Sequence, residues 1–169
     1  MTQIETALAD NRAALGEFVA TARSLEGAGW TAPRAEGAWT PAQIAQHVAL
    51  VYEYSRDIAL GTPPKGSLPR FLRPFLRRLV VDSTLRAGKF TRKGRAPAMF
   101  KPSATPPSVT EAVQRLETAV SSFEAAIRSG HPEGRHFVTH PYFGDIATTD
   151  YIRFQAIHTR HHRAQLIST

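Results

Sequence analysis

The C-terminal stretch AIHTRHHRAQL, residues 156–166, contains three of the seven histidines of the chain. On an α-helix, His158 and His162 share one face because they are four residues apart, whereas His161 points about a quarter-turn away. Neutral imidazole is the commonest protein ligand of transition-metal ions. A metal site built on this pair needs a further ligand from elsewhere in the chain.

His47 is the candidate for that further ligand. It lies in WTPAQIAQHVALVYEYSRDIALG, residues 39–61, within an apolar stripe that includes Ile44 and Val51. Three imidazoles can hold a divalent ion at about 2.0–2.1 Å and leave a coordination position for water or substrate. Spacing alone leaves an alternative open, in which His47 is a hydrogen-bonded core residue and the C-terminal pair has no ligand role.

Four segments repeat apolar residues at the spacing of an amphipathic helix. Helices are predicted over residues 2–25, 40–60, 108–129 and 148–167. Thr40 is a good N-cap for the second helix, followed by Pro41, and Gln43 completes a capping box. Ser108 and Glu111 form the same signal at the start of the third. Each of these helices has one apolar stripe to bury.

The predicted fold class is all-α, an antiparallel four-helix bundle that forms a single domain over residues 1–169. Four apolar stripes are buried most simply against one another, and a chain of this length suffices for one core but is short for two. The long, basic, Pro-rich connection between the second and third helices, residues 62–107, leaves room for a crossover. Pro74 is expected to break or kink a short helix within it. The stretch GHPEGRHFVTHPYFGDIATT, residues 130–149, is predicted to be a turn-rich loop that leads into the fourth helix.

The positive charge of the chain is concentrated in that connection. The formal net charge is +7, from 21 Lys and Arg against 14 Asp and Glu. Between Lys65 and Arg95 there are ten basic residues and one acid, Asp82, so this segment carries +9 and the rest of the chain −2. Three interpretations stay open: a solvated loop, a surface that attracts an anionic substrate or thiol to the metal site, and a contact with nucleic acid or an anionic membrane. Nucleic acid is the less favoured partner because no nucleic-acid-binding motif is present.

Composition excludes several kinds of chemistry. The chain has no cysteine, so it has no disulfide, no thiolate metal ligand and no thiol nucleophile of its own. No apolar run reaches the length of about 18 residues that a membrane span needs. The first residues, MTQIETALADNRAALGEF, do not resemble a signal peptide. We therefore expect a cytoplasmic protein without a membrane span, in which any thiol chemistry uses an external thiol.

Three stretches together resemble the DinB-like (YfiT-like) family of metalloenzymes. They are WTPAQIAQH (39–47), HPYFG (140–144) and HTRHHRAQ (158–165), which follow the family pattern in order and spacing. The resemblance implies an antiparallel four-helix bundle, a triad of His47, His158 and His162 around a nickel or zinc ion, and often a homodimer. Relatives in this superfamily include S-transferases and isomerases that use low-molecular-weight thiols such as bacillithiol or mycothiol.

Several other polar side chains could support such a site. They lie four or seven residues from His47 or His158, and each could orient an imidazole or a bound water, or could serve in packing or capping. These candidates are Gln43, Tyr54, Tyr151 and Gln165. His161 is expected to face solvent or a subunit contact. His131, His136 and His140 lie in the turn-rich loop, where turn and capping roles predominate, although His140 could reach the site.

We therefore predict a metal-dependent transferase or hydrolase that acts on a small molecule. Its three histidines would hold a divalent ion that activates water or a low-molecular-weight thiol. No paired carboxylates, Ser-His-Asp arrangement or glycine-rich phosphate loop suggests another catalytic site. The alternative is a non-catalytic stress-response or binding module whose basic segment, residues 65–95, contacts an anionic partner.

Overall fold

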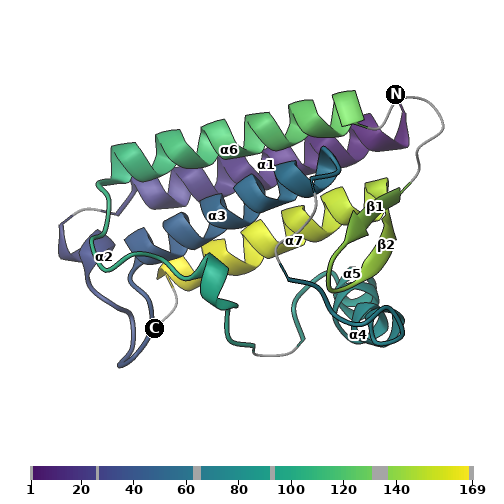
Figure 1. Ribbon diagram of the computed structural model, residues 1–169. Coiled ribbons are helices and arrows are strands. Elements are labelled where there is room, and N and C mark those ends of the chain that lie inside the picture. Colours follow the sequence, from purple (N-terminus) through teal and green to yellow (C-terminus); the bar gives the residue numbers. More distant parts are fainter. Residues whose placement is uncertain (1, 26, 63–65, 92–93, 131–136, 168–169) are drawn as a thin grey trace.

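A computed structural model describes residues 2–25, 27–62, 66–91, 94–130 and 137–167. This part of the chain is mostly helical, and four long helices lie side by side in it (Figure 1). They are α1 (Gln3–Arg23), α3 (Pro41–Ala59), α6 (Val109–Gly130) and α7 (Thr148–Ile167). These bounds agree within two residues with the four helices predicted from the apolar periodicity.

The predicted start signals of α3 and α6 are confirmed. The Thr40 side chain accepts a hydrogen bond from the Gln43 backbone N–H, and the Gln43 side chain accepts one from the Thr40 backbone N–H. Ser108 and Glu111 make the same reciprocal pair before α6. Capping satisfies backbone N–H groups that have no partner within the helix, which fixes where each helix begins.

The sequence predicts an antiparallel bundle, but not all of the long helices run antiparallel to their neighbours. Contacts between α3 and α7 join early residues of one to late residues of the other, and so do the ion pairs between α1 and α6. The helices α1 and α7, in contrast, run in the same direction, and so do α3 and α6 (Figure 1). The physical reason is the long connection over residues 60–108, which returns the chain to the starting end of α3 before α6 begins.

The core lies between the four long helices and is built from their apolar stripes. Burying one large apolar side chain contributes about 1.5–3 kcal/mol, so these residues dominate the packing. The largest fully buried side chains include Leu8, Phe18, Tyr52, Leu116, Phe123, Ile127, Tyr151, Ile152 and Leu166. Mutual burial of α1 against α7 and of α3 against α6 thus fixes the two elements that carry the predicted metal ligands, α3 and α7.

The connection from α3 to α6 contains more helix than its prolines suggested. Helix α4 (Arg73–Arg77), the π-helical turn η1 (Arg78–Asp82) and α5 (Ser83–Ala87) follow one another without a break. Pro74 lies in the first turn of α4, where its missing N–H costs no hydrogen bond, so it marks the start of the helix, and residues 68–72 before it are not helical. A 3₁₀ turn, η2 (Ala98–Phe100), comes later in the same connection.

The segment before α7 contains a hairpin where a turn-rich loop was predicted. Strands β1 (Phe137–His140) and β2 (Gly144–Ala147) pair antiparallel, with Val138 opposite Ile146 and His140 opposite Gly144. Gly144 has a φ of 71°, the left-handed conformation that closes a three-residue hairpin loop. The strands were missed because four-residue elements show too little alternation to be read from sequence.

A short helix, α2 (Ala28–Thr31), buries Trp30, whose indole N–H donates to the Pro107 carbonyl. Within the described ranges, no helix combines the length and the apolar character needed to cross a membrane.

Candidate metal centre

The structure brings His47, His158 and His162 together between α3 and α7. Because these two helices are antiparallel, the first half of α3 faces the second half of α7. The ring centroids are 5.4 Å apart for His47 and His158, 4.7 Å for His47 and His162, and 4.4 Å for His158 and His162. One ligand nitrogen from each ring lies within 4.8 Å of the others, which is the arrangement expected of a group that could hold one metal ion.

The two histidines of α7 have the separation that a shared ion requires. Their Nε2 atoms are 3.1 Å apart. Two nitrogens bound to one ion at about 2.0–2.1 Å lie about 2.9–3.4 Å apart when the angle between their bonds is about 90–110°. His158 and His162 therefore need little rearrangement to bind the same ion.

A backbone carbonyl fixes the orientation of His47. Its Nδ1 is 2.8 Å from the carbonyl oxygen of Phe100 in η2. A carbonyl oxygen only accepts, so Nδ1 carries the proton and Nε2 keeps its lone pair. Sequence reasoning missed this partner, because a carbonyl 53 residues away leaves no residue-type signal. Partners of this kind hold a ligating imidazole in place and set its tautomer.

His162 is oriented by Gln165, which is in turn oriented by His161. The amide nitrogen of Gln165 is 3.1 Å from Nε2 of His161, and its oxygen is 2.8 Å from Nδ1 of His162. Donation from the amide nitrogen to His161 leaves the amide oxygen facing His162, so Nδ1 of His162 is the donor. Nε2 of His162 consequently keeps the lone pair that a metal needs. Of the four supporting candidates, Gln165 is the one that the structure places against a triad histidine.

His158 has no comparable orienting partner. Its Nδ1 atom is buried and makes no hydrogen bond among the described residues. Its tautomer is therefore not imposed by a neighbour. Without an ion, Nε2–H can donate to His162; with the proton on Nδ1, the Nε2 lone pair is free for a metal. This unconstrained imidazole and the two oriented ones make a donor set that fits a divalent transition-metal ion.

Burial keeps the three imidazoles neutral. It lowers the pKa of His47, against the opposing effect of the Phe100 carbonyl, and lowers the pKa of His162 to about 3. The pKa of His158 falls well below its ordinary value, first through burial and then through the nearby His162 and His47. A neutral imidazole is the form that binds metals, so at neutral pH the site is already in its binding state.

Aromatic rings surround the triad. Trp39 lies 5.1 Å from His47, Phe100 lies 6.4 Å from it, and Phe90 lies 5.8 Å from His158, measured between ring centroids. Phe90 also lies 5.1 Å from His161. His161 is half-buried and is not one of the three clustered histidines. Apolar walls of this kind limit solvent access and strengthen electrostatic interactions inside the site.

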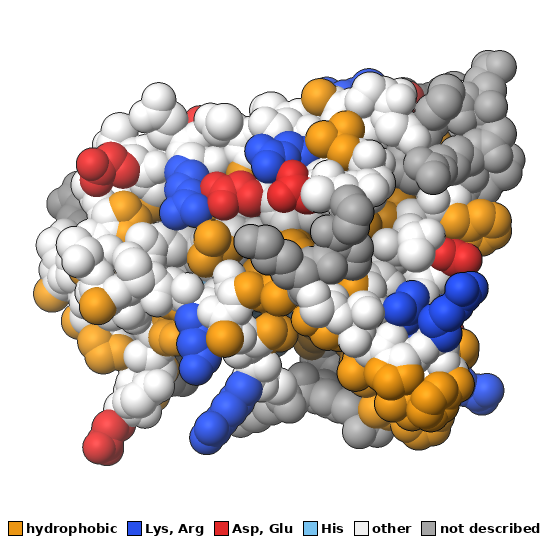
Figure 2. Space-filling view, viewed as in Figure 1, with side chains coloured by type: hydrophobic (Ala, Val, Ile, Leu, Met, Phe, Trp, Pro, Cys, Tyr) orange, Lys and Arg blue, Asp and Glu red, His pale blue; other side chains and the backbone are white. Residues whose placement is uncertain are grey.

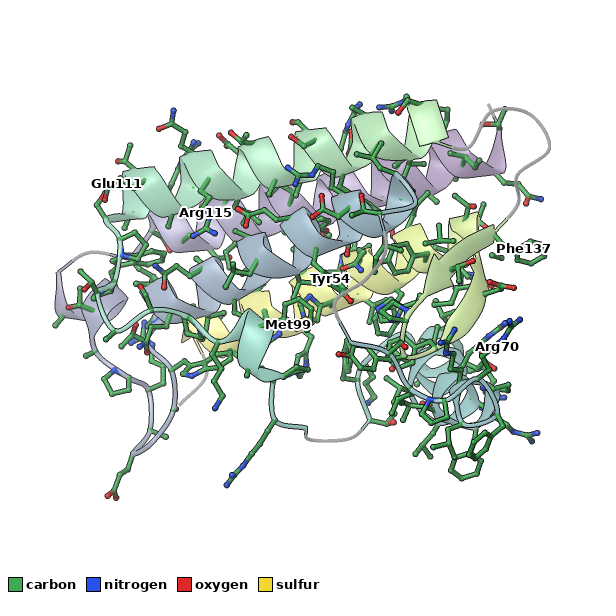
Figure 3. The ribbon with its side chains drawn as sticks, in the orientation of Figure 1. Tyr54, Arg70, Met99, Glu111, Arg115 and Phe137 are labelled. Carbon is green, nitrogen blue, oxygen red and sulfur yellow. The ribbon has the colours of Figure 1, made fainter. Side chains whose placement is uncertain are left out.

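The other supporting candidates lie away from the ligand nitrogens. Tyr151 donates to the Ser55 hydroxyl in the core, and Gln43 belongs to the capping box of α3. Tyr54 points from α3 towards η2, where its ring lies 5.1 Å from Phe100 (Figure 3). Its hydroxyl is buried and has no hydrogen-bond partner among the described residues, and burial raises its pKa to about 12.

His140 has a structural place at the end of β1. Its Nδ1 accepts a hydrogen bond from the Tyr142 backbone N–H at 3.2 Å, which matches the turn role considered from sequence. Its ring stacks on Phe143 with the centroids 4.5 Å apart. Two histidines of the same sequence stretch, His131 and His136, lie outside the described residues.

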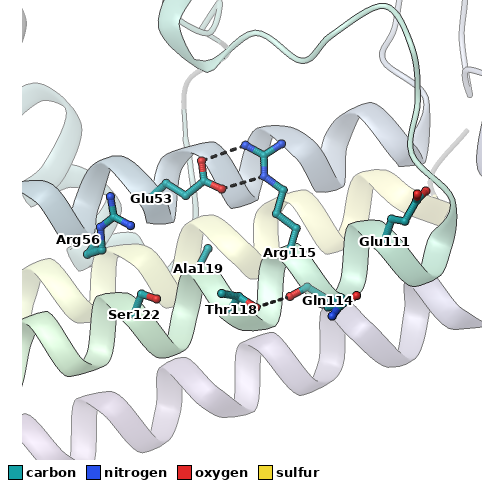
Figure 4. Close-up of a pocket in the computed structure, with 8 residues that line it drawn as sticks. All are labelled: Glu53, Arg56, Glu111, Gln114, Arg115, Thr118, Ala119 and Ser122. Carbon is teal, nitrogen blue, oxygen red and sulfur yellow. Dashed lines mark hydrogen bonds and ion pairs between the residues drawn. The ribbon is translucent and has the colours of Figure 1, made fainter.

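A surface groove between α3 and α6 lies apart from this centre (Figure 4). A two-pronged ion pair crosses it, from Arg115 to Glu53, with N–O distances of 2.8 and 2.9 Å. None of its lining residues is a histidine. The charges of Arg115 and Glu53 are paired with each other, so the histidine cluster is the better candidate for chemistry.

Comparison with known proteins supports the same centre. The sequence profile of the DinB superfamily matches residues 10–166, which include all three clustered histidines. Searches of curated proteins and of solved structures found no match.

Proposed function

The chain belongs to the DinB superfamily, and from this premise we propose that it is a metal-dependent enzyme. In this proposal His47, His158 and His162 bind one divalent ion, nickel or zinc. An ion held there would make water or an external low-molecular-weight thiol more nucleophilic, for hydrolysis or S-transfer on a small-molecule substrate.

One observation carries the proposal: three neutral imidazoles from two helices converge, and the hydrogen bonds at Nδ1 of His47 and of His162 turn the Nε2 lone pairs of both rings towards the shared centre. Nδ1 of His158 is also buried without a hydrogen-bond partner among the described residues, a cost in free energy that a histidine serving only in packing would not need to carry. Three protein ligands also suit a catalytic ion, since a structural zinc site usually has four.

A divalent ion held here would supply Lewis-acid chemistry, lowering the pKa of water or a thiol and polarising an electrophile. The protein's own residues do the positioning. The Phe100 carbonyl and Gln165 aim two imidazoles, and the rings of Trp39 and Phe90 limit access of bulk water. The chain has no cysteine, so a thiol nucleophile must come from solution.

The proposal extends to the whole chain. We propose that the chain acts in the cytoplasm as one four-helix-bundle domain, and that it forms a homodimer, as the family resemblance implies. Sedimentation equilibrium of the purified protein tests the dimer, and a monomer at micromolar concentration would contradict it.

The alternative is a binding module in which the ion only stabilises the fold. Cobalt substitution separates the two functions, because the visible spectrum of Co²⁺ reports its ligands. If the ion is catalytic, adding 2-mercaptoethanol to the cobalt-loaded protein should change this spectrum and add a thiolate charge-transfer band.

Azide, a small anion that binds to accessible metal ions, serves as a second probe. A spectrum that neither the thiol nor azide alters would show that the ion has no coordination position open to small molecules and would contradict the catalytic proposal. The His158→Ala variant is the control, since it should give no protein-bound cobalt spectrum at all.

A further inference from the structure

Helix α4 and the turn before it present three large apolar side chains to solvent. Phe71 is 80% exposed, Phe75 is 71% exposed and Leu72 is 42% exposed. Figure 2 shows hydrophobic side chains gathered at the corner that α4 occupies, with Lys and Arg side chains beside them. We call Phe71, Leu72 and Phe75 the apolar face of α4. Exposed aromatic residues at this density mark a contact surface more often than ordinary surface variation does.

The opposite side of the same helical unit is anchored to the protein. Val81 and Thr84 are buried, and α5 packs against α7. Arg77 donates to the backbone carbonyl of Asp145 in β2, and Arg73 donates to the carbonyl of Leu68. The unit therefore has a fixed orientation, and its apolar face is directed outward rather than folded back onto the core.

Basic side chains accompany the apolar face. Residues 66–91 contain six Lys and Arg and one acid, Asp82, which pairs with Arg77. Arg70 and Arg78 are exposed and, among the described residues, make no hydrogen bond or ion pair. The surface thus combines unpaired positive charge with exposed aromatic rings.

We propose that the apolar face of α4 docks the protein peripherally on an anionic lipid membrane. The rings of Phe71 and Phe75 would enter the boundary between headgroups and acyl chains, and Arg70 and Arg78 would contact lipid phosphates. This combination of a basic and an apolar face is what holds interfacial helices at anionic membranes. The inference does not depend on the chemistry at the histidines.

Charge decides against the most obvious other occupant, a second copy of the chain. A two-fold dimer through this surface would place the same patch against itself, so Arg70 and Arg78 would face arginines of the other copy. Nucleic acid would pair with the arginines, but the aliphatic Leu72 on the same exposed face favours acyl chains over bases. The experiment below distinguishes a membrane from both of these occupants, a second copy of the chain and nucleic acid.

Co-sedimentation with vesicles tests the proposal on the full chain. The wild-type protein should sediment with vesicles of equal parts phosphatidylglycerol and phosphatidylcholine, and not with pure phosphatidylcholine vesicles. The double variant Phe71→Ser/Phe75→Ser, which keeps the charge, should lower the partition coefficient by about tenfold or more.

The matched control replaces two exposed apolar residues elsewhere, Phe137→Ser/Ile167→Ser, which are 55% and 58% exposed. It should bind like the wild type. Phe137 points away from β1 and is labelled in Figure 3 together with Arg70. Replacing Arg70 and Arg78 by Gln should weaken binding and reduce its dependence on salt, because fewer charges remain to be screened.

Three results would overturn the proposal. One is a wild-type protein that stays in solution with the anionic vesicles at low salt. Another is equal binding by the Phe71→Ser/Phe75→Ser variant and the wild type. The third is a wild-type protein that does not bind vesicles, combined with a Phe71→Ser/Phe75→Ser variant that has changed from dimer to monomer or has lost the ability to bind an oligonucleotide. Far-ultraviolet circular dichroism establishes that each variant is folded.

Discussion

The amide of Gln165 connects His161 to His162. Its oxygen accepts from Nδ1 of His162 while its nitrogen donates to His161, so the histidine that lies outside the triad still helps to fix the tautomer of one that lies inside it. This explains why three histidines occur within five positions: two converge on the ligand site and the third positions the group that orients one of them.

Replacing Gln165 by leucine should weaken metal binding about 10–100-fold, the usual effect of removing a group that orients a ligating histidine. The leucine keeps the bulk of the side chain but gives Nδ1 of His162 no acceptor. Competition with a chelator of known affinity measures the change. Gln114→Leu, an exposed position on α6, is the control and should bind as the wild type does. Equal affinities for all three proteins would contradict the role given to Gln165.

For individual residues, the spacing of the sequence predicted which side chains share a helix face. Helical phase placed His158 and His162 on one face and brought Gln165 close to them. It could not reveal the carbonyl of Phe100, because any residue type can supply a carbonyl from a turn far along the chain. It also could not decide the position of Tyr151, whose hydroxyl is taken by Ser55 in the core.

The starts of the helices were the features best predicted from the sequence, whereas the two short strands were not predicted. Capping boxes at Thr40 and Ser108 are local, so residue types a few positions apart specify them. The hairpin of β1 and β2 depends on the pairing and burial of Val138 against Ile146. Strands of four residues are too short to show this as an alternating pattern in the sequence. The direction of α6 relative to α3 likewise follows from a long connection that has no periodic signal.

The end of α6 packs against the end of α3 so closely that only glycine fits. A Cβ atom at Gly130 would lie 2.5 Å from the carbonyl oxygen of Ala59. Gly130→Ala should therefore destabilise the protein by about 1–3 kcal/mol, the usual cost of overpacking. The steric cost exceeds the gain of about 0.5–1 kcal/mol that alanine brings to a helix.

Gly16→Ala provides the matched comparison. A Cβ at Gly16 on α1 meets nothing within 4 Å, so this variant should be more stable than the wild type by about 0.5–1 kcal/mol. Urea unfolding of the three proteins under one metal condition measures both effects. A stabilised Gly130→Ala variant would show that the ends of α3 and α6 are not packed as described.

The molecule combines an almost neutral body, which contains the four long helices, with a basic connection between α3 and α6. The segment from Lys65 to Arg95 carries +9 and the remainder −2. The sequence predicted this separation of charge and the helical fold class. It also indicated a short helix in the basic segment, but it could not predict that the helix continues to Ala87 with a buried side at Val81 and an exposed side at Phe75, because tertiary contacts decide which side is buried.

Stability of the metal-free protein should fall as the pH is lowered from about 6.5 towards 3. Burial lowers the pKa of His140 to about 3, whereas in the unfolded chain it is about 6.5. Between these values the unfolded state binds a proton that the folded state does not, so each such histidine contributes a slope of about 1.4 kcal/mol per pH unit.

The His140→Phe variant should show a slope smaller by about that amount, whatever its absolute stability. Urea unfolding at several pH values, with a chelator present throughout, gives the slopes. A variant and a wild type with the same slope would contradict the buried, neutral state of His140.

The most direct test of the tri-histidine metal site is the metal content of protein purified without a histidine tag and saturated with nickel or zinc. Elemental analysis should find about one ion per wild-type chain and per His161→Ala chain, and almost none in His47→Ala or His158→Ala. No bound metal in the wild type, or undiminished metal in His47→Ala and His158→Ala, would contradict a metal centre formed by His47, His158 and His162.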